Sequence, residues 1–469
     1  ALNLTPGQPY SRSELDLAER ALLDLNVFSS VVITPTIDKT EAGVENPTIP
    51  LKVTVETAKL KAVHIGGGAQ TDSLQTDLHL VGGWENRNFL GGLRSISFEA
   101  KPGVVLYPTR FPTFDSPRHL LPKLKLNAQF RQPGFIEART GFFTQLEGSR
   151  APVIYQSHQV SDQVLGYDDA RIGAGVDRSF NSLRLYGSFA HTVQYDRPFM
   201  YLGTMDPDLH PVVISYPKLF LALDLRDEKI HPHEGGYVST ELQVAGVGGS
   251  AVDVKTTSEV RGYVPLARKW TLAARVNVGL LFAQNYGDTI EATANGASYE
   301  DDPSRRPGWV RDIQLMFLRG FFAGGLGSNR GYALREIGPH GIVPQATSTL
   351  ANTNCTEQQQ DPNCNLPLGG FTLWEASLEL RYPISGPFSG AFFTDTADVS
   401  PKPVNFRLNR PHLSVGVGFR YDTPVGPIRF DAGYRVPGLQ APADASGEGV
   451  PNTTFGLPLA LSFGIGEAF

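Results

Sequence analysis

The chain has 469 residues, of which 41% are hydrophobic and only 19% are charged. Its net charge of −6 and the lack of any basic run argue against a nucleic-acid-binding protein. The sequence has no run of about eighteen apolar residues, which excludes a transmembrane helix but not a transmembrane β-barrel, whose strands need apolar residues only at alternate positions.

The first 60 residues predict a small α+β unit. Within residues 11–26, Leu15, Ala18, Leu22 and Leu25 recur at helical spacing. Two strand-like segments follow, VFSSVVITPTID and IPLKVTVETAKL. One helix and two strands are too few to bury a core of their own. We therefore expect the later part of a larger module. The chain shows no signal peptide, as a mature or trimmed form of an exported protein would.

From about residue 62 to the end, segments of alternating apolar and polar residues follow one another with no convincing helix between them. They lie near residues 62–70, 74–84, 93–102, 122–131, 139–148, 168–178, 182–194, 214–226, 236–246, 252–264, 269–284, 371–383, 388–396, 412–422, 427–436 and 458–469. Sixteen antiparallel strands are the expected result.

The two faces of these segments differ in chemistry. In residues 269–284, Leu272, Val276 and Leu280 share one face, while Arg275 and Asn277 share the other, which must be wet. A soluble sandwich, such as an all-β adhesin, could bury the apolar face against a second sheet. A closed barrel could expose it to lipid. The last segment ends on an aromatic residue, which suits a membrane barrel and favours that prediction.

Residues 413–436 illustrate the expected orientation. They read as two strands joined by a tight turn at 423–426. We expect the alternate residues of the second strand to face lipid, namely Ile428, Phe430, Ala432, Tyr434 and Val436. Arg429, Asp431 and Arg435 should face the lumen.

The long connection between residues 285 and 370 contains both cysteines, Cys355 and Cys364, in the polar stretch NCTEQQQDPNCN. A loop disulfide in an oxidising compartment is the favoured interpretation, and a pair of free thiols is the alternative. A metal site would need further ligands nearby, and the stretch has none.

Catalytic patterns are lacking. His231, His233 and Glu234 could be metal ligands, but they lie in the turn-like phrase HPHEGG. The sequence has neither a Gly-x-Ser-x-Gly elbow nor a nucleotide-binding glycine motif with its strand–helix context. We predict no enzyme activity, no catalytic residue, no metal site and no cofactor.

Several separated motifs point to one family. GSNRGYALREIGPHG contains Arg330, Gly331 and Tyr332, and ASLELRYP and SGAFFTDTADV contain Glu379 and Asp395. GGWENRNFLGG, LALDLRDEKIHPHEGGYVS and TPVGPIRFDAGY occur in the matching order. With these motifs the sequence resembles the outer-membrane assembly-factor superfamily, which comprises POTRA (polypeptide-transport-associated) plus β-barrel proteins of the BamA and TamA type.

The resemblance implies two domains. Residues 1–60 would be the later part of the last POTRA domain. Residues 61–469 would be a sixteen-stranded transmembrane antiparallel β-barrel with a long sixth loop at about 310–370. In the family this loop folds into the lumen, where Arg330 would meet Glu379 and Asp395. The phrase after Asp395 departs from the family pattern, which leaves Asp398 as a rival partner.

The implied function is insertion or export of β-rich outer-membrane proteins through a lateral gate between the first and last barrel strands. The predicted gate residues are Gly66, Gly67, Gly68, Gly464, Gly466 and Phe469. Glycine weakens a strand interior, although these glycines could merely relieve crowding. A TamA-like protein is slightly favoured over a BamA-like one, and a two-partner-secretion-type pore for one dedicated protein is the alternative.

The resemblance also implies partners and a location. The protein would sit in the bacterial outer membrane with its POTRA part in the periplasm. It would contact the lipid bilayer and act on unfolded β-barrel or autotransporter substrates. Periplasmic or inner-membrane accessory proteins would bind through the POTRA part, and no nucleic acid is expected.

Overall fold

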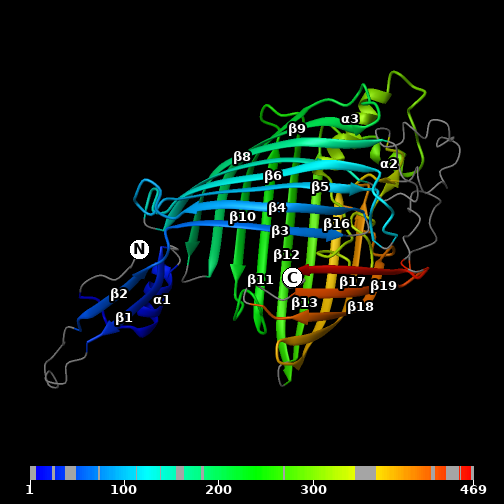
Figure 1. Cartoon of the computed structure of the whole chain (residues 1–469). Helices are drawn as coiled ribbons and strands as arrows, with labels where there is room; N and C mark the ends of the chain where they lie inside the picture. Colours follow the sequence, from blue (N-terminus) through cyan, green and yellow to red (C-terminus); the bar gives the residue numbers. More distant parts are fainter. Residues whose placement is uncertain are drawn as a thin grey trace.

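A computed structural model gives the structure of the chain. It describes residues 7–23, 27–36, 49–71, 74–111, 113–137, 139–154, 163–180, 184–267, 270–343, 366–423, 428–439, 454 and 456–465. Within these residues a small N-terminal unit precedes one large antiparallel sheet that curls into a barrel (Figure 1).

The N-terminal unit consists of α1 (Arg12–Leu23), β1 (Phe28–Pro35) and β2 (Leu51–Thr57). The two strands pair antiparallel, and Val31 of β1 is buried together with Leu15, Ala18 and Leu22 of the helix. The helical spacing seen in the sequence therefore forms the small core of this unit. Leu25 lies outside the described residues.

The sheet has sixteen strands, each paired with its neighbour along the chain. They are β3 (Lys61–Thr71), β4 (Thr76–Asn86), β5 (Ser95–Tyr107), β6 (His119–Gln132), β7 (Thr140–Pro152), β8 (Val164–Phe180), β9 (Leu185–Leu202), β10 (Val212–Asp224), β11 (Gly235–Ala245), β12 (Asp253–Ala267), β13 (Trp270–Ala283), β16 (Thr372–Ser385), β17 (Phe388–Ser400), β18 (His412–Tyr421), β19 (Ile428–Arg435) and β20 (Leu459–Ile465). Every predicted segment overlaps one of them, so the predicted sixteen-stranded antiparallel barrel is confirmed.

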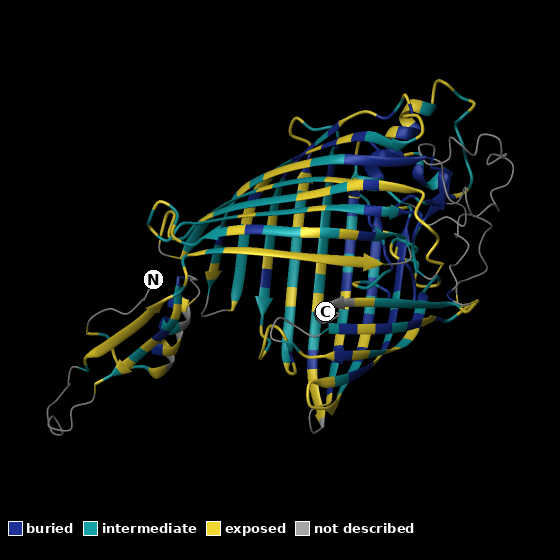
Figure 2. Ribbon diagram, viewed as in Figure 1, coloured by how far each residue is buried: buried dark blue, intermediate teal, exposed yellow. Residues whose placement is uncertain are grey.

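Each of the sixteen strands exposes a large apolar side chain. One from each strand in turn is Ile65, Leu80, Phe98, Leu124, Leu146, Ile172, Phe189, Leu219, Val238, Val260, Val276, Leu378, Phe392, Val417, Phe430 and Phe463. In β19, Arg429, Asp431 and Arg435 alternate with the outward-facing residues and are buried. Exposed and less exposed positions also alternate along many of the strands in Figure 2. A sandwich would bury its apolar face against a second sheet, whereas a continuous apolar exterior suits a lipid environment. The sandwich alternative is therefore wrong.

The two ends of the barrel differ. At the end where β3 begins, beside the α1 unit, several strands are joined by short connections such as 386–387. At the opposite end, which we call the loop end, most of the connections are longer, and 284–371 is the longest (Figure 1). This asymmetry is the one expected for a membrane barrel. Residues 424–426 of the predicted tight turn lie outside the described part.

The longest connection contains two helices, α2 (Ile290–Ala294) and α3 (Arg306–Arg319), so the expectation of no helix after residue 62 was wrong. Trp309, Ile313 and Met316 are buried at helical spacing, and Pro307 lies in the first turn of α3. The loop-like residues on either side of this single apolar stretch concealed the helix, although a proline in the first turn is itself typical of a helix start. None of the helices in the described ranges has both the length and the apolar character needed to cross a membrane.

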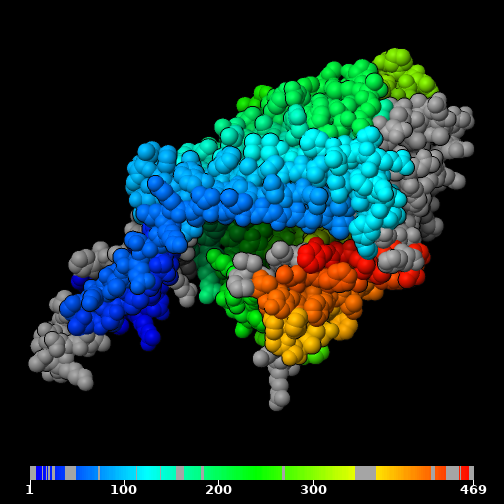
Figure 3. Space-filling model, viewed as in Figure 1, coloured from blue at the N-terminus to red at the C-terminus, as the bar shows by residue number. Residues whose placement is uncertain are grey.

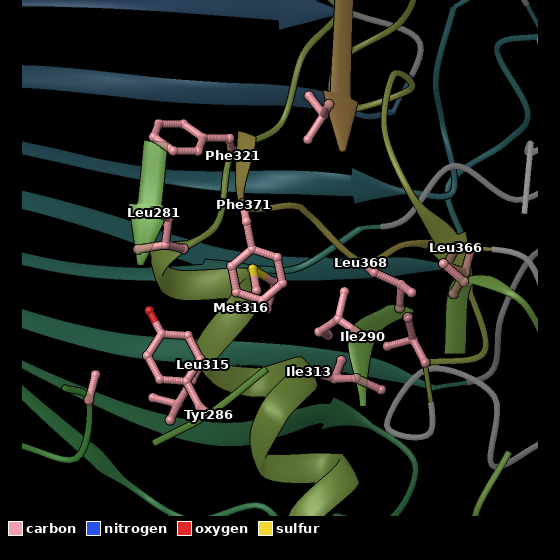
Figure 4. Packing of buried hydrophobic residues seen from close by; sticks show 14 of the residues in the cluster. Leu281, Tyr286, Ile290, Ile313, Leu315, Met316, Phe321, Leu366, Leu368 and Phe371 are labelled. Carbon is pink, nitrogen blue, oxygen red and sulfur yellow. The ribbon is translucent and has the colours of Figure 1, made fainter. Parts of the chain in front are cut away.

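The main apolar core lies at the loop end (Figure 4). There Ile313 and Met316 of α3 cluster with Leu281, Ile290 and Phe371 from the surrounding chain. The Trp309 indole Nε1 donates a hydrogen bond to Thr293 Oγ1 at 3.0 Å, which ties α3 to α2. Two short strands, β14 (His340–Gly341) and β15 (Leu366–Pro367), pair beside this core. The long connection therefore forms a packed cap on the barrel.

Candidate functional site

After α3 the chain turns inward and places Arg330 against the inner wall of β16 and β17. Its side chain is only 2% exposed. Nε donates to Asp395 Oδ2 at 2.7 Å and Nη2 donates to Asp395 Oδ1 at 2.8 Å, a bidentate pair. Nη1 donates to the Glu379 carboxylate, and the guanidinium lies 3.6 Å from the centre of the Phe393 ring. We call this set the Arg330 clamp.

Strand alternation places the two carboxylates on the same wall. Ser377 of β16 is the register partner of Asp395, and Glu379 follows two residues later on the same face. Glu379 also accepts hydrogen bonds from Arg381 at 2.8 Å and from Arg420 at 3.4 Å. One carboxylate thus lies among three guanidiniums, and this buried charge is well compensated.

The charge of Arg330 is itself stabilised by its partners. Burial alone lowers the pKa of Arg330, but the Asp395 hydrogen bond and the negative charges of Asp395 and Glu379 outweigh burial and raise it above its ordinary value. The guanidinium is therefore charged at every accessible pH. The clamp is an ion pair under all conditions that leave the carboxylates ionised.

Gly331 and Tyr332 fit the same wall. A Cβ on Gly331 would lie 2.3 Å from the Ser414 Cβ, so only glycine fits there. Tyr332 is buried, with its ring edge-on to His412 at 5.5 Å and the Arg435 guanidinium 5.4 Å from its centre. All three predicted loop residues therefore lie against the wall formed by β16 to β19.

The sequence analysis missed several supporting residues. The Asn329 amide donates to the His412 carbonyl at 2.6 Å, and Ser414 Oγ donates to Asn329 Oδ1 at 2.6 Å. Gly433 of β19 allows a close approach, because a Cβ there would lie 2.6 Å from the Arg330 carbonyl oxygen. The glycine between two inward charged residues of β19 was the available signal for this approach.

Asp398, the rival partner, lies elsewhere. Its carboxylate accepts two hydrogen bonds from Arg407, at 2.8 and 2.9 Å, and Arg407 belongs to the connection between β17 and β18. Asp398 is therefore engaged away from Arg330, and Glu379 and Asp395 hold the arginine. The predicted cysteine pair, Cys355 and Cys364, lies outside the described residues.

The barrel has an open seam between its first and last strands. Over the described ranges, β3 forms a ladder only with β4 and β20 only with β19. Figure 3 shows a hollow between the surfaces of β3 (blue) and β20 (red), with green residues of the far wall visible through it. Val63 and Ile65 of β3 are 71% and 86% exposed. The seam thus presents two strand edges.

The predicted seam glycines differ in their surroundings. A Cβ on Gly66 would meet nothing within 4 Å, whereas one on Gly67 would lie 3.3 Å from Leu80. A Cβ on Gly68 would lie 2.8 Å from the His79 ring, so Gly68 makes room for that ring. The relief of crowding thus applies to Gly68 and not to Gly66.

The predicted glycines of the last strand are only partly described. Gly464 pairs with Arg429 in the ladder between β19 and β20. Gly466 and Phe469 lie outside the described residues.

The turn at 225–234 has no metal-site geometry. The backbone N–H groups of His233 and Glu234 both donate to Asp227 Oδ1, at 3.0 and 3.2 Å. Within the described part of the chain, no group of three or more His, Cys, Asp or Glu side chains could hold a metal ion.

Comparison with known proteins places these features in a family. The model of the Omp85 superfamily domain matches residues 88–469, which is most of the chain and nearly all of the barrel. The chain belongs to the Omp85 superfamily. A SAM50-like protein of Schizosaccharomyces pombe is 22% identical over 433 residues, covering 89% of this chain and 76% of the relative.

Two solved structures share the fold of this Omp85 chain. BamA from Haemophilus ducreyi lacking POTRA domains 1–3 matches with a TM-score of 0.61 at 15% identity, covering 95% of this chain and 78% of that truncated chain. CdiB from Acinetobacter baumannii matches with a TM-score of 0.54 at 12% identity, covering 99% of this chain and 70% of CdiB. At these identities the likeness shows the fold alone.

This Omp85 barrel combines a sixth loop that is held firmly in place with a seam between its first and last strands. The clamp holds the sixth loop against β16 to β19. Among the strands that the structure describes, β3 and β20 each have a partner strand on one side, so the seam presents the other edge of each strand. Such an arrangement can accept an added strand at a defined place in the wall.

Proposed function

We propose that this chain is an outer-membrane assembly factor that inserts or exports β-rich outer-membrane proteins through the seam between β3 and β20. The observation that carries the proposal is the pair of unpaired strand edges at this seam. An unpaired edge can template an incoming strand by β-augmentation, because main-chain hydrogen bonds pair with any sequence. Membership of the Omp85 superfamily supports the same role.

The proposal includes an orientation in the membrane. The N-terminal unit would be the later part of a POTRA domain in the periplasm, and the loop end would face the exterior of a bacterial outer membrane. The short connections beside α1 and the long ones at the opposite end support this orientation. Unfolded barrel proteins or autotransporters are the substrates, and accessory proteins would dock on the N-terminal unit. The 423–431 hairpin and Gly464 and Gly466 favour the TamA-type branch.

A cross-link across the seam tests the proposal. Cys355 and Cys364 are first replaced by serine, and cysteines are then introduced at Ile65 and at either Leu461 or Phe463, with a short thiol cross-linker to close the seam. We expect the locked protein, reconstituted in liposomes, to lose nearly all of its ability to fold an unfolded barrel substrate. Heat-modifiable gel mobility of the substrate measures the loss.

A matched control places the same cross-link where a ladder already exists. Phe419 of β18 and Phe430 of β19 are register partners, and both are exposed. Cysteines there should cross-link without loss of activity. Full activity with the seam locked would refute the proposal.

A transport pore for one dedicated protein is the second candidate, because the fold is also similar to that of CdiB. The two candidates differ in the route that the substrate takes. An assembly factor releases its substrate sideways into lipid, whereas a pore conducts it through the lumen. If the seam cross-link spares export and the isolated barrel gives steady single-channel conductance, the pore is the better description.

A further inference from the structure

We propose that Arg319 and Asp253 form a second lock on the sixth loop, which positions the loop so that Arg330 reaches its clamp. Arg319 is the last residue of α3, and Asp253 is the first residue of β12. The proposal deepens the proposed function, but its main test needs no substrate and is independent of it.

The contact has the geometry of a strong and specific pair. Arg319 Nε donates to Asp253 Oδ2 at 3.0 Å and Nη2 donates to Oδ1 at 2.6 Å. The third nitrogen, Nη1, donates to Gln243 Oε1 of β11 at 2.6 Å. Both charged side chains are at most 5% exposed. Every nitrogen of the guanidinium thus has an acceptor, as a planar fork with fixed geometry requires.

The surroundings fix both partners. The Tyr286 hydroxyl donates to Asp253 Oδ2 at 2.9 Å, and the Tyr216 ring of β10 lies 5.0 Å from the guanidinium. Lys255 Nζ donates to the carbonyl oxygen of Arg319 at 2.7 Å, where the negative end of the α3 dipole favours a cation. The C-terminal end of α3 is therefore held by its side chain and by its backbone, against the wall formed by β10 to β12.

Stability alone does not explain such a pair. Removing two charges from water costs as much as their attraction returns, so buried ion pairs contribute little net stability compared with apolar side chains. What a bidentate pair supplies is a unique position. Here that position belongs to the residue from which the loop descends into the lumen.

The backbone between Arg319 and Arg330 is held at several points. Phe321 pairs with Gly370, and Ala323 pairs with Ile337, each in an antiparallel bridge. Gly324 has a φ of +99°, and a Cβ there would lie 2.3 Å from the Ala333 carbonyl oxygen. Because the backbone is held at these points, a shift of Arg319 is passed on to Arg330.

The test measures how firmly the loop tip is seated. Ala333 is buried three residues after Arg330, so Ala333→Cys in a background lacking Cys355 and Cys364 reports opening through its labelling rate with a bulky maleimide. In the folded barrel, we expect Arg319→Gln to raise this rate roughly tenfold or more, because it removes the guanidinium that pairs with the buried Asp253 carboxylate and so favours local opening. Arg330→Gln should raise it similarly.

Two further variants keep the test decisive. Arg311→Gln is the matched control, because Arg311 lies on the same helix but is exposed, and within the described residues it donates to the neutral carbonyls of Asn285 and Ser250, both at 2.9 Å. It should leave the labelling rate unchanged. Should Arg319→Gln fail to fold, Asp253→Asn removes the same ion pair with almost no change of shape.

The result that overturns the proposal is equally specific. If the ion-pair variant folds and labels at the parental rate while Arg330→Gln labels fast, Arg319 does not position the tip. Equal acceleration by Arg311→Gln would also overturn it, because any loosening of the cap would then have the same effect. Neither outcome depends on whether the seam cross-link blocks insertion.

Discussion

Arg330→Gln should abolish insertion activity and unseat the sixth loop while the barrel still folds. The substitution leaves Asp395 and Glu379 buried beside a neutral side chain, and breaking a buried pair in this way costs about 3–5 kcal/mol. That cost falls on the seating of the loop rather than on the ladders of the barrel. Substrate folding in liposomes and labelling of Ala333→Cys measure the two effects.

An exposed ion pair provides the control for charge loss. Arg197 of β9 pairs with Asp168 at 2.6 Å, but its side chain is 54% exposed. Arg197→Gln should therefore change stability by only about 0–1 kcal/mol and leave activity intact. If Arg330→Gln were as mild as Arg197→Gln, the clamp would not hold the loop.

Gly433→Ala should push the loop tip off the wall without removing any charge. The new methyl group would lie 2.6 Å from the Arg330 carbonyl oxygen and 2.7 Å from the Gly331 nitrogen. Because both are backbone atoms, neither can rotate away, and overpacking of this kind costs about 1–3 kcal/mol. We expect faster labelling of Ala333→Cys and reduced insertion, with all ion-pairing groups still present.

Gly262→Ala is the matched control for the added methyl group. Gly262 lies in β12, and a Cβ there would meet nothing within 4 Å. This variant should behave like the parent in both assays. Equal behaviour of the two alanine variants would show that the loop tip does not pack against β19 as closely as the structure has it.

Much of the barrel could be predicted because strand alternation is a local signal. Phe430, Tyr434 and their buried neighbours Arg429 and Asp431 follow one another in sequence, so the pattern is visible without any partner. The positions of strand ends were less accurate. For example, β9 extends to Leu202, well beyond the predicted end at residue 194, because hydrogen bonding to β8 continues past the alternating part.

The candidate site depends on contacts between distant residues, and these are visible only in the folded chain. Arg330, Glu379 and Asp395 were named through the family resemblance, but the choice between Asp395 and Asp398 required the position of Arg407. The hydrogen bonds of Asn329 and the ion pair between Arg319 and Asp253 produce no local pattern in the sequence. Helix α3 was missed because loop-like residues surround its apolar stretch, and the core that its buried side chains complete with other elements is visible only in the folded chain.

The Arg330 clamp also constrains the order of folding. Its arginine precedes its acceptors Glu379 and Asp395 in the chain by 49 and 65 residues. The loop tip cannot be seated before β16 and β17 have formed and paired, and contacts of such sequence separation form late. We therefore expect the barrel wall to form first and the sixth loop to enter the lumen afterwards. During refolding, the cysteine introduced by Ala333→Cys should become protected from maleimide labelling only after the barrel shows heat-modifiable gel mobility. If both changes occur at the same time, this order of folding is wrong.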